Sequence, residues 1–328
     1  MTLSRRDFLA TAALGLTAPL PTFVQAQSVN ARSAASLFVE RFCSKGAALD
    51  NDNGNVWHSE SVGVSLLACA RSNNSEKFSK IYEQAQLLRR KDGLYSWKAK
   101  GTRVLDFNNA SDGDVYIAWA LLEAQKRGLD LPFDAGAKAR ELMRSIEELC
   151  VRPSSHGLII VPGVYGFIST KSPWIINPSY WVFPAFHEFQ LADSAGPWAD
   201  LSENGLRILK YSRFGRFDLP PDWLELSSPV RPAEKLSTRF SYDAMRVALY
   251  LAQAGHYEHP ALKNTVRFFK SSNRSWIDLN TSALSPYGMD DSAQVVLTVA
   301  QGGKSMDRLS RKYYPASLAV LGNLQIQS

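Results

Sequence analysis

The chain has 328 residues, 45% of them hydrophobic, and its 37 lysines and arginines outnumber 31 acidic residues to give a formal net charge of +6. This length and composition can fill a sizeable hydrophobic core. The charge favours an acidic or neutral polymer over a cationic one as ligand, and the absence of a long basic run argues against nucleic-acid binding.

Residues 1–26 have the pattern of an export signal. Arg5 and Arg6 precede an apolar stretch that is too short to span a bilayer, and small residues ending at Ala26 follow it. The paired arginines fit the twin-arginine type, with an ordinary secretory signal as the alternative. We therefore expect cleavage after Ala26, a periplasmic or secreted protein without stable membrane insertion, and one domain over 27–328, which no linker-like stretch divides.

The three cysteines are Cys43, Cys69 and Cys150. They lie in apolar or helical-looking stretches without the spacing of a metal site, and they allow at most one disulfide. Buried free thiols are the favoured interpretation.

Helical periodicity dominates the chain after the signal. In residues 74–90 the apolar positions recur at steps of three and four, which predicts a helix with one buried face. Residues 62–70, 115–122 and 247–254 are instead apolar almost all round, which predicts helices enclosed by other elements.

Enclosed and one-sided helices alternate along the chain. The predicted pairs are 60–71 with 74–90, 112–127 with 135–149, 242–254 with 260–271, and 290–301 with 307–322. Such repeated helical hairpins predict an all-α fold, a double ring in which the first helix of each pair faces the middle. The pattern lapses over residues 151–185, where a short β-hairpin would fit.

Each of three enclosed helices begins with a serine close to an acid. The pairs are Ser59 with Glu60, Ser111 with Asp112, and Ser241 with Asp243, and Asp290 is a looser fourth case. Taken singly, each pair is explained by capping of the helix N-terminus. Taken together, the N-termini of parallel inner helices gather at one end of the ring, where Glu60, Asp112 and Asp243 would face a central pocket. Carboxylates in that arrangement suit the hydrolysis of a glycosidic bond.

Aromatic residues crowd the same helix starts. Core packing and stacking on sugar rings are both open interpretations for such residues, and Trp119, deep in an apolar run, is expected in the core. The candidates for sugar binding are Trp57, Trp97, Tyr116 and Tyr242.

The segment 110–124, ASDGDVYIAWALLEA, resembles the signature of glycoside hydrolase family 8, the bacterial endoglucanases. Shorter stretches resemble further blocks of that family in the same order, and the resemblance spans roughly residues 50 to 300. These stretches are Ser59-Glu60, Tyr95-Ser96-Trp97-Lys98, Asn177-Pro178-Ser179-Tyr180 and Tyr242-Asp243-Ala244-x-Arg246.

The resemblance implies an (α/α)6 barrel and an inverting reaction. Glu60 would be the general acid and Asp243 the general base. Asp112 would bind and distort the sugar, and Tyr180 and Arg246 would line the water site. Arg246 lies one turn from Asp243 and would keep that carboxylate ionised, whereas apolar neighbours would favour the protonated form of Glu60.

The expected function is that of an exported inverting endo-β-1,4-glycanase acting on cellulose or an acidic exopolysaccharide, with polysaccharide synthesis or secretion machinery as a further partner to consider. Residues 61–64 depart from the family pattern beside the acid, which leaves the polymer open. Xylo-oligosaccharide, mixed-linkage glucan or chitosan as substrate is one alternative, and a non-catalytic glycan-binding protein on the same fold is another. No cofactor is expected, because the acidic run 50–54 and the pair His256 and His259 do not form convincing metal sites.

Overall fold

The computed structural model describes residues 33–168, 173–303 and 309–323, all within one compact unit of the chain, so the predicted signal at 1–26 lies outside the described residues. Helices dominate this part. They are α1 (Ala34–Phe42), α2 (Ser59–Arg71), α3 (Ser75–Ala85), α4 (Ser111–Lys126), α5 (Ala135–Cys150), α6 (Phe183–Ala192), α7 (Trp198–Tyr211), α8 (Met245–Gln253), α9 (Pro260–Ser272), α10 (Asp291–Ala300) and α11 (Tyr313–Gly322), with the 3-10 turns η1 (Gln86–Leu88) and η2 (Pro178–Tyr180).

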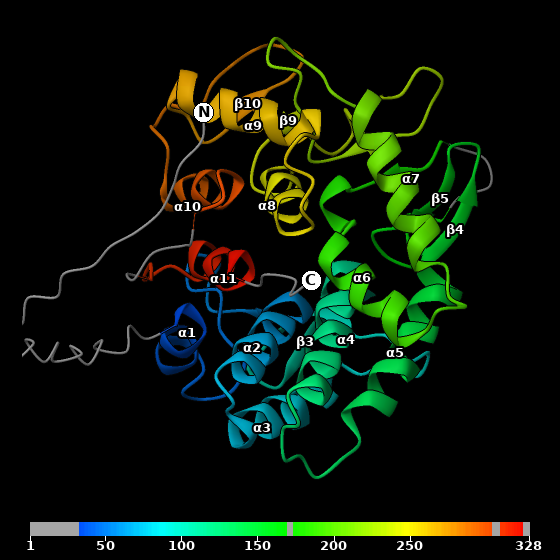
Figure 1. The fold of residues 1–328 in the computed structure, drawn as a ribbon, viewed down its shortest axis with the longest axis vertical. Helices are drawn as coiled ribbons and strands as arrows, with labels where there is room; N and C mark the ends of the chain where they lie inside the picture. Colours follow the sequence, from blue (N-terminus) through cyan, green and yellow to red (C-terminus); the bar gives the residue numbers. More distant parts are fainter. Residues whose placement is uncertain (1–32, 169–172, 304–308, 324–328) are drawn as a thin grey trace, which may run out of the picture. The chain divides into compact units, whose positions relative to one another are not determined.

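The enclosed helices form a closed ring. Helices α2, α4, α6, α8, α10 and α11 pack against one another in that order, and α11 returns to α2 (Figure 1). In α2 and α4 nearly every residue is buried, as their all-round apolar sequences predict.

The remaining helices cover this ring from outside. Helix α3 packs on α2, α5 on α4, α7 on α6 and α9 on α8, while α1 covers both α2 and α11. The covering helices bury one stripe each; α3, for example, buries Phe78, Ile81, Tyr82 and Ala85. The predicted double ring of inner and outer helices is therefore present.

The last predicted pair does not consist of an inner and an outer helix. Helix α10 packs on both α8 and α11, as an inner helix does. Helix α11, which was predicted to be the outer member, is buried at almost every position and packs on α2, so both helices belong to the inner ring. The charged Arg311 and Lys312, which the predicted range 307–322 included, precede α11 and do not belong to it. Helices α1, α6 and α7 were not among the predicted pairs.

Short antiparallel strands lie between the helices. The predicted hairpin is formed by β4 (Val151–Ser154) and β5 (Gly157–Ile160). Three further sheets were not predicted. They are β1 (Trp57–His58) with β2 (Ser96–Lys100) and β3 (Arg103–Asn109), β6 (Ile175–Ile176) with β7 (Leu224–Glu225) and β8 (Arg231–Pro232), and β9 (Arg239–Phe240) with β10 (Ile277–Asp278).

Three of these strands lead into inner helices. Strand β1 runs directly into α2, β3 ends two residues before α4, and β9 leads into the turn before α8. The N-terminal ends of three inner helices are thus each preceded by a strand, which fixes where each helix begins.

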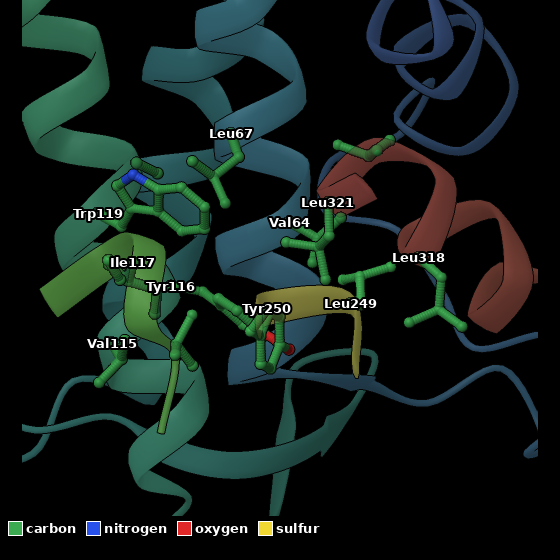
Figure 2. Packing of buried hydrophobic residues seen from close by; sticks show 14 of the residues in the cluster. Val64, Leu67, Val115, Tyr116, Ile117, Trp119, Leu249, Tyr250, Leu318 and Leu321 are labelled. Carbon is green, nitrogen blue, oxygen red and sulfur yellow. The ribbon is translucent and has the colours of Figure 1, made fainter. Parts of the chain in front are cut away.

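The core fills the space between the inner helices. Figure 2 shows side chains from four of them meeting, among them Val64 and Leu67 of α2, Val115, Ile117 and Trp119 of α4, Leu249 of α8, and Leu318 and Leu321 of α11. Trp119 is in this core, as predicted. The three cysteines are buried free thiols, which confirms the favoured interpretation. Within the described ranges, no helix combines the length and the apolar character needed to cross a bilayer.

Candidate active site

Three carboxylates from three inner helix starts meet on one guanidinium. Arg246, in the first turn of α8, places Nη1 3.1 Å from Glu60 Oε2 and 3.2 Å from Asp112 Oδ2, and Nη2 2.7 Å from Asp243 Oδ1. The predicted convergence of Glu60, Asp112 and Asp243 is therefore confirmed, and Arg246 is its centre.

The three carboxylates differ in their access to solvent. The side chain of Asp243 is 35% exposed and that of Glu60 19%, whereas Asp112 and Arg246 are only 4% and 3% exposed. A ligand from solvent can therefore touch Glu60 and Asp243, while Asp112 and Arg246 form the buried base beneath them.

Glycines allow the starts of α2 and α4 to approach closely. A Cβ at Gly113 would lie 2.0 Å from the Ser59 hydroxyl oxygen and 2.8 Å from the backbone nitrogen of Glu60. A Cβ at Gly63 would lie 2.3 Å from the Cβ of Tyr116. Contacts this short are excluded for any larger residue, so these two positions set the spacing between Glu60 and Asp112.

The serines at the helix starts do not cap their helices. In α2 the cap is His58, whose Nδ1 accepts from the Ser61 backbone nitrogen at 3.1 Å. The Ser111 hydroxyl instead donates to the carbonyl of Val161 at 2.7 Å. The capping interpretation is therefore wrong for these serines, and in the looser fourth case Asp290 itself caps α10.

The pKa values of the buried pair reflect their environment. Burial raises the pKa of Asp112 to about 6; Arg246 opposes this shift, and the carboxylates of Glu60 and Asp243 add to it. Burial alone would lower the pKa of Arg246, but the nearby tyrosines and acids raise it well above its ordinary value. The guanidinium therefore stays charged and holds the three acids together.

Tyr180 of η2 lies beside this cluster. Its half-buried ring has the guanidinium carbon of Arg246 5.9 Å from its centroid. Burial, and then the charges of Asp112 and Asp243, raise its pKa well above the ordinary value. Tyr180 is thus a neutral phenol that lies against the guanidinium of Arg246.

The predicted sugar-binding rings divide into two groups. Trp97 and Tyr242 are half-buried and offer ring surface to solvent. Trp57 is 1% exposed and donates from Nε1 to the Gly101 carbonyl at 2.9 Å, and Tyr116 is fully buried. The structure therefore places Trp57 and Tyr116 in the core, where their rings have no free face for a sugar to stack on.

Tyrosines near the site were missed by the sequence interpretation. The hydroxyl of Tyr313 donates to Glu60 Oε1 at 3.3 Å, and that of Tyr314 donates to the backbone carbonyl of Tyr242. Both lie at the start of α11, which was predicted to be an outer helix. Under Arg246, the hydroxyls of Tyr116 and Tyr250 are hydrogen-bonded to each other, and Figure 2 shows the two side chains side by side.

Asp222 was also missed. It precedes β7, is 4% exposed, and accepts from the backbone nitrogens of Ser241 and Ala244, both at 2.9 Å. No sequence signal connects it to Asp243, because the two are 21 residues apart and the segment between them has no regular helix or strand pattern.

No metal site was found in the described part of the chain. Its histidines, cysteines and acids form no group of three or more that could hold an ion. His259, weighed as a ligand, caps α9 by accepting from the Ala261 backbone nitrogen at 3.2 Å. The site itself is built from carboxylates, phenols and one guanidinium.

Comparison with known proteins gives a consistent result. The family model described as Glycosyl hydrolases family 8 matches residues 15–327. An endoglucanase from Cellulomonas uda is 30% identical over 272 residues, which cover 79% of this chain and 74% of that protein. A probable endoglucanase from Novacetimonas hansenii is 34% identical over 256 residues, which cover 74% of this chain and 73% of that protein.

A solved structure matches the fold over nearly its whole length. It is a GH8 endo-β-1,4-glucanase from an Achatina fulica gut metagenomic library, with a TM-score of 0.81 and 30% sequence identity over 90% of this chain and 97% of that chain. With the ring of inner helices described above, this match confirms the predicted (α/α)6 barrel.

Proposed function

We propose, because the chain belongs to glycosyl hydrolase family 8, that it hydrolyses β-1,4-glucosyl linkages within a polysaccharide and inverts the anomeric carbon. That it is a glycoside hydrolase follows from its family. The choice of β-1,4-glucan is taken from the relatives, which carry the names endoglucanase and endo-β-1,4-glucanase.

In the proposed reaction, Glu60 donates a proton to the leaving oxygen and Asp243 accepts a proton from the attacking water. The family resemblance places Asp112 at the sugar of the cleavage point. Because its side chain is only 4% exposed, we assign it the role of holding Arg246, and through it Glu60 and Asp243, from below. Arg246 contacts Glu60 and Asp243 alike, so the division into acid and base comes from the family resemblance and not from this cation.

One observation carries the proposal. Two solvent-accessible carboxylates, Glu60 and Asp243, are held on a single buried cation, and each comes from a different inner helix start. A core would not retain such a cluster for stability, because buried charges cost several kcal/mol to desolvate and apolar replacements serve as well. The arrangement is explained by a reaction that needs two carboxyl groups on one substrate.

The test is reducing-end release from carboxymethylcellulose by wild type, Glu60→Gln and Asp243→Asn. Glu76→Gln is the matched control, since Glu76 also lies in the first turn of a helix, α3, but bonds only an exposed lysine at 2.6 Å. We expect both site variants to lose at least about 10²-fold in kcat and the control to lose nothing. A wild type that binds β-glucans but releases no ends would refute the catalytic proposal in favour of glycan binding.

Inversion is tested separately on a defined cello-oligosaccharide. Proton NMR of the first product formed from β-linked substrate should show the α-anomer, because water attacks from the face opposite the leaving group. An initial β-anomer would show retention and would reassign Asp243 as a nucleophile.

The proposed substrate extends to acidic exopolysaccharides. The net charge of +6 favours an anionic polymer. Next to the site, the exposed Arg239 stacks on the Trp276 ring at 4.2 Å, and Trp276 connects through Tyr287 to Tyr242. Faster hydrolysis of a uronic-acid-bearing glucan than of a neutral one, lost at high salt, would support this extension. A role beside polysaccharide synthesis or secretion needs a separate test, in which a strain lacking the protein should make polymer of changed length or amount.

We also propose that the protein is exported to the periplasm or beyond. The support is the pattern of residues 1–26, with Arg5 and Arg6 before an apolar stretch. Cell fractionation of wild type and the Arg5→Lys, Arg6→Lys double variant tests it. Equal export of wild type and the double variant would show that export does not need the paired arginines, which would contradict the twin-arginine assignment.

A further inference from the structure

The turn that carries Asp243 is not part of a helix. Helix α8 begins at Met245, and its N-cap, Ala244, has no side chain that could accept from the first backbone N–H groups. Yet Asp243 has to be held in place, since its carboxylate bonds Arg246 at 2.7 Å while remaining 35% exposed. Met245 and Arg246 donate their backbone N–H groups to the carbonyls of Ser241 and Asp243, both at 3.0 Å, but the N–H groups of Ser241 and Ala244 need an acceptor from elsewhere in the chain.

Asp222 supplies that partner. Its Oδ1 accepts from the backbone nitrogens of Ser241 and Ala244, both at 2.9 Å, which are the residues that open and close the turn. Its Oδ2 accepts from the Ser241 hydroxyl at 2.5 Å and, more weakly, from the Ser237 hydroxyl at 3.4 Å. One carboxylate therefore closes both ends of the segment 241–244.

Asp222 is itself fixed from behind. Its backbone nitrogen donates to the carbonyl of Arg239 in β9 at 2.7 Å, and the chain enters β7 two residues after Asp222. With a side chain only 4% exposed, it cannot contact a polysaccharide in solvent. Its effect on the reaction can pass only through the turn that it holds.

A purely structural cap would not require a carboxylate here. Serine and asparagine cap helix starts equally well and avoid the desolvation of a buried charge. The hydrogen bonds of Asp222 are all with neutral donors; burial raises its pKa, and the charge of the acidic Asp243 adds to that effect. The carboxylate is explained by its ability to accept from several donors at once, which one amide oxygen does less well.

We propose that Asp222 is the positioning residue for the catalytic turn, holding Asp243 where it can accept the proton of the attacking water. This inference rests on the proposed role of Asp243. It adds a residue that contacts neither sugar nor water but determines how rigidly the base is presented.

The test compares kcat and KM of four variants on one cello-oligosaccharide. Asp222→Ala leaves the turn without its acceptor, and we expect kcat to fall about 100-fold, as for a displacement of about 1 Å, with KM changed less than about threefold. Asp222→Asn keeps one acceptor and should recover part of that loss. Ser241→Ala removes one hydroxyl bond and should lower kcat a few-fold.

Thr238→Ala is the matched control. Thr238 lies three residues before Ser241, but its hydroxyl donates to Asp278 at 2.6 Å and not to Asp222. We expect its kcat to match wild type. If Asp222→Ala does not fold, the kcat values of the other variants still test the inference. Lower kcat in Asp222→Asn and Ser241→Ala than in Thr238→Ala supports the positioning role, and equal values contradict it.

Hydrogen exchange separates this inference from the proposed function. The amides of Ser241 and Ala244 should exchange faster in Asp222→Asn and Asp222→Ala, whether or not the wild type cleaves the chosen glucan. Unchanged exchange, or unchanged kcat in folded Asp222→Ala from an active wild type, overturns the positioning role. If exchange is faster in the variants but the wild type is inactive on every glucan, Asp222 does hold the turn 241–244, but the catalytic use proposed for that turn is refuted.

Discussion

Glu60 and Asp112 lie in the first turns of α2 and α4, whereas Asp243 lies on a turn that ends before α8 begins. The two helix starts are pressed together at Gly63 and Gly113, so core packing fixes both carboxylates. Asp243 is not fixed by helix packing; its turn is held by hydrogen bonds to Asp222 instead.

The comparison shows two ways to fix a carboxylate. Packing is stiff, because an interior is close-packed and does not deform smoothly. A hydrogen-bonded turn is softer, and its carboxylate is also the more exposed one. In the proposed reaction, the general acid Glu60 would be held in place by packing, and the general base Asp243, held by hydrogen bonds, would be free to adjust to a substrate.

Arg246 joins the two regions, so its replacement should have the largest effect. Arg246→Lys offers one charged nitrogen where the guanidinium has several donors, and it cannot bond Glu60, Asp112 and Asp243 in the same geometry. We expect kcat on carboxymethylcellulose to fall about 10²–10³-fold. Lost activity with an unchanged near-UV circular dichroism spectrum would place the defect in the site.

Arg71→Lys is the control for that experiment. Arg71 pairs with Glu123 at 2.8 Å at the other end of the same two helices, α2 and α4. Its replacement should lower the melting temperature without changing kcat. Equal losses of kcat in the two variants would show that Arg246 acts through stability alone.

Gly113→Ala should break the packed region and leave the turn intact. The added Cβ would push Ser59 and the backbone of Glu60 away, which should cost about 1–3 kcal/mol in the free energy of unfolding and lower kcat about tenfold or more. Urea unfolding and initial rates measure the two effects. Gly288→Ala, whose Cβ would meet nothing closer than 3.7 Å, is the control and should change neither.

Sequence patterns predicted the packed region better than the turn region. The all-round apolar runs located α2, α4 and α8, and the acids at their starts led to the carboxylate cluster. Local sequence carries this information because a helix places residues at fixed steps. The same periodicity could not reveal Asp222 or Tyr313, because each reaches the site by a tertiary contact between segments far apart in the chain.

The errors of the sequence interpretation have the same origin. Serine at a helix start is a good capping signal, yet Ser111 bonds Val161, which comes from a distant strand region. Trp57 and Tyr116 lie beside the acids in sequence, but their rings turn into the core. Which way a side chain points at a helix start depends on the neighbouring elements, and no single-sequence pattern records them.

Asp114 offers the smallest effect and the sharpest contrast with Asp222. It is a fully buried carboxyl of the packed region, accepting from the Tyr95 backbone nitrogen at 2.8 Å and the Asn109 amide at 2.9 Å. Burial raises its pKa to about 7. Unlike Asp222, it fastens α4 to the neighbouring sheet and bonds no residue of the turn that carries Asp243.

Because this pKa is raised above its unfolded value near 4, Asp114 favours the folded state most at low pH, and that contribution is lost as the pH rises from about 4 through about 7. Asp112 and Asp222, with pKa values of about 6, act in the same direction. Wild type should therefore be more stable to urea at pH 5 than at pH 8. Asp114→Asn removes one of the three titrations and should reduce that difference by about 2 kcal/mol, with kcat within about twofold of wild type. An unchanged pH dependence would show that Asp114 is ionised throughout. A large loss of kcat would show that the packed region controls Asp243 as well as Glu60, so that the two regions do not act separately.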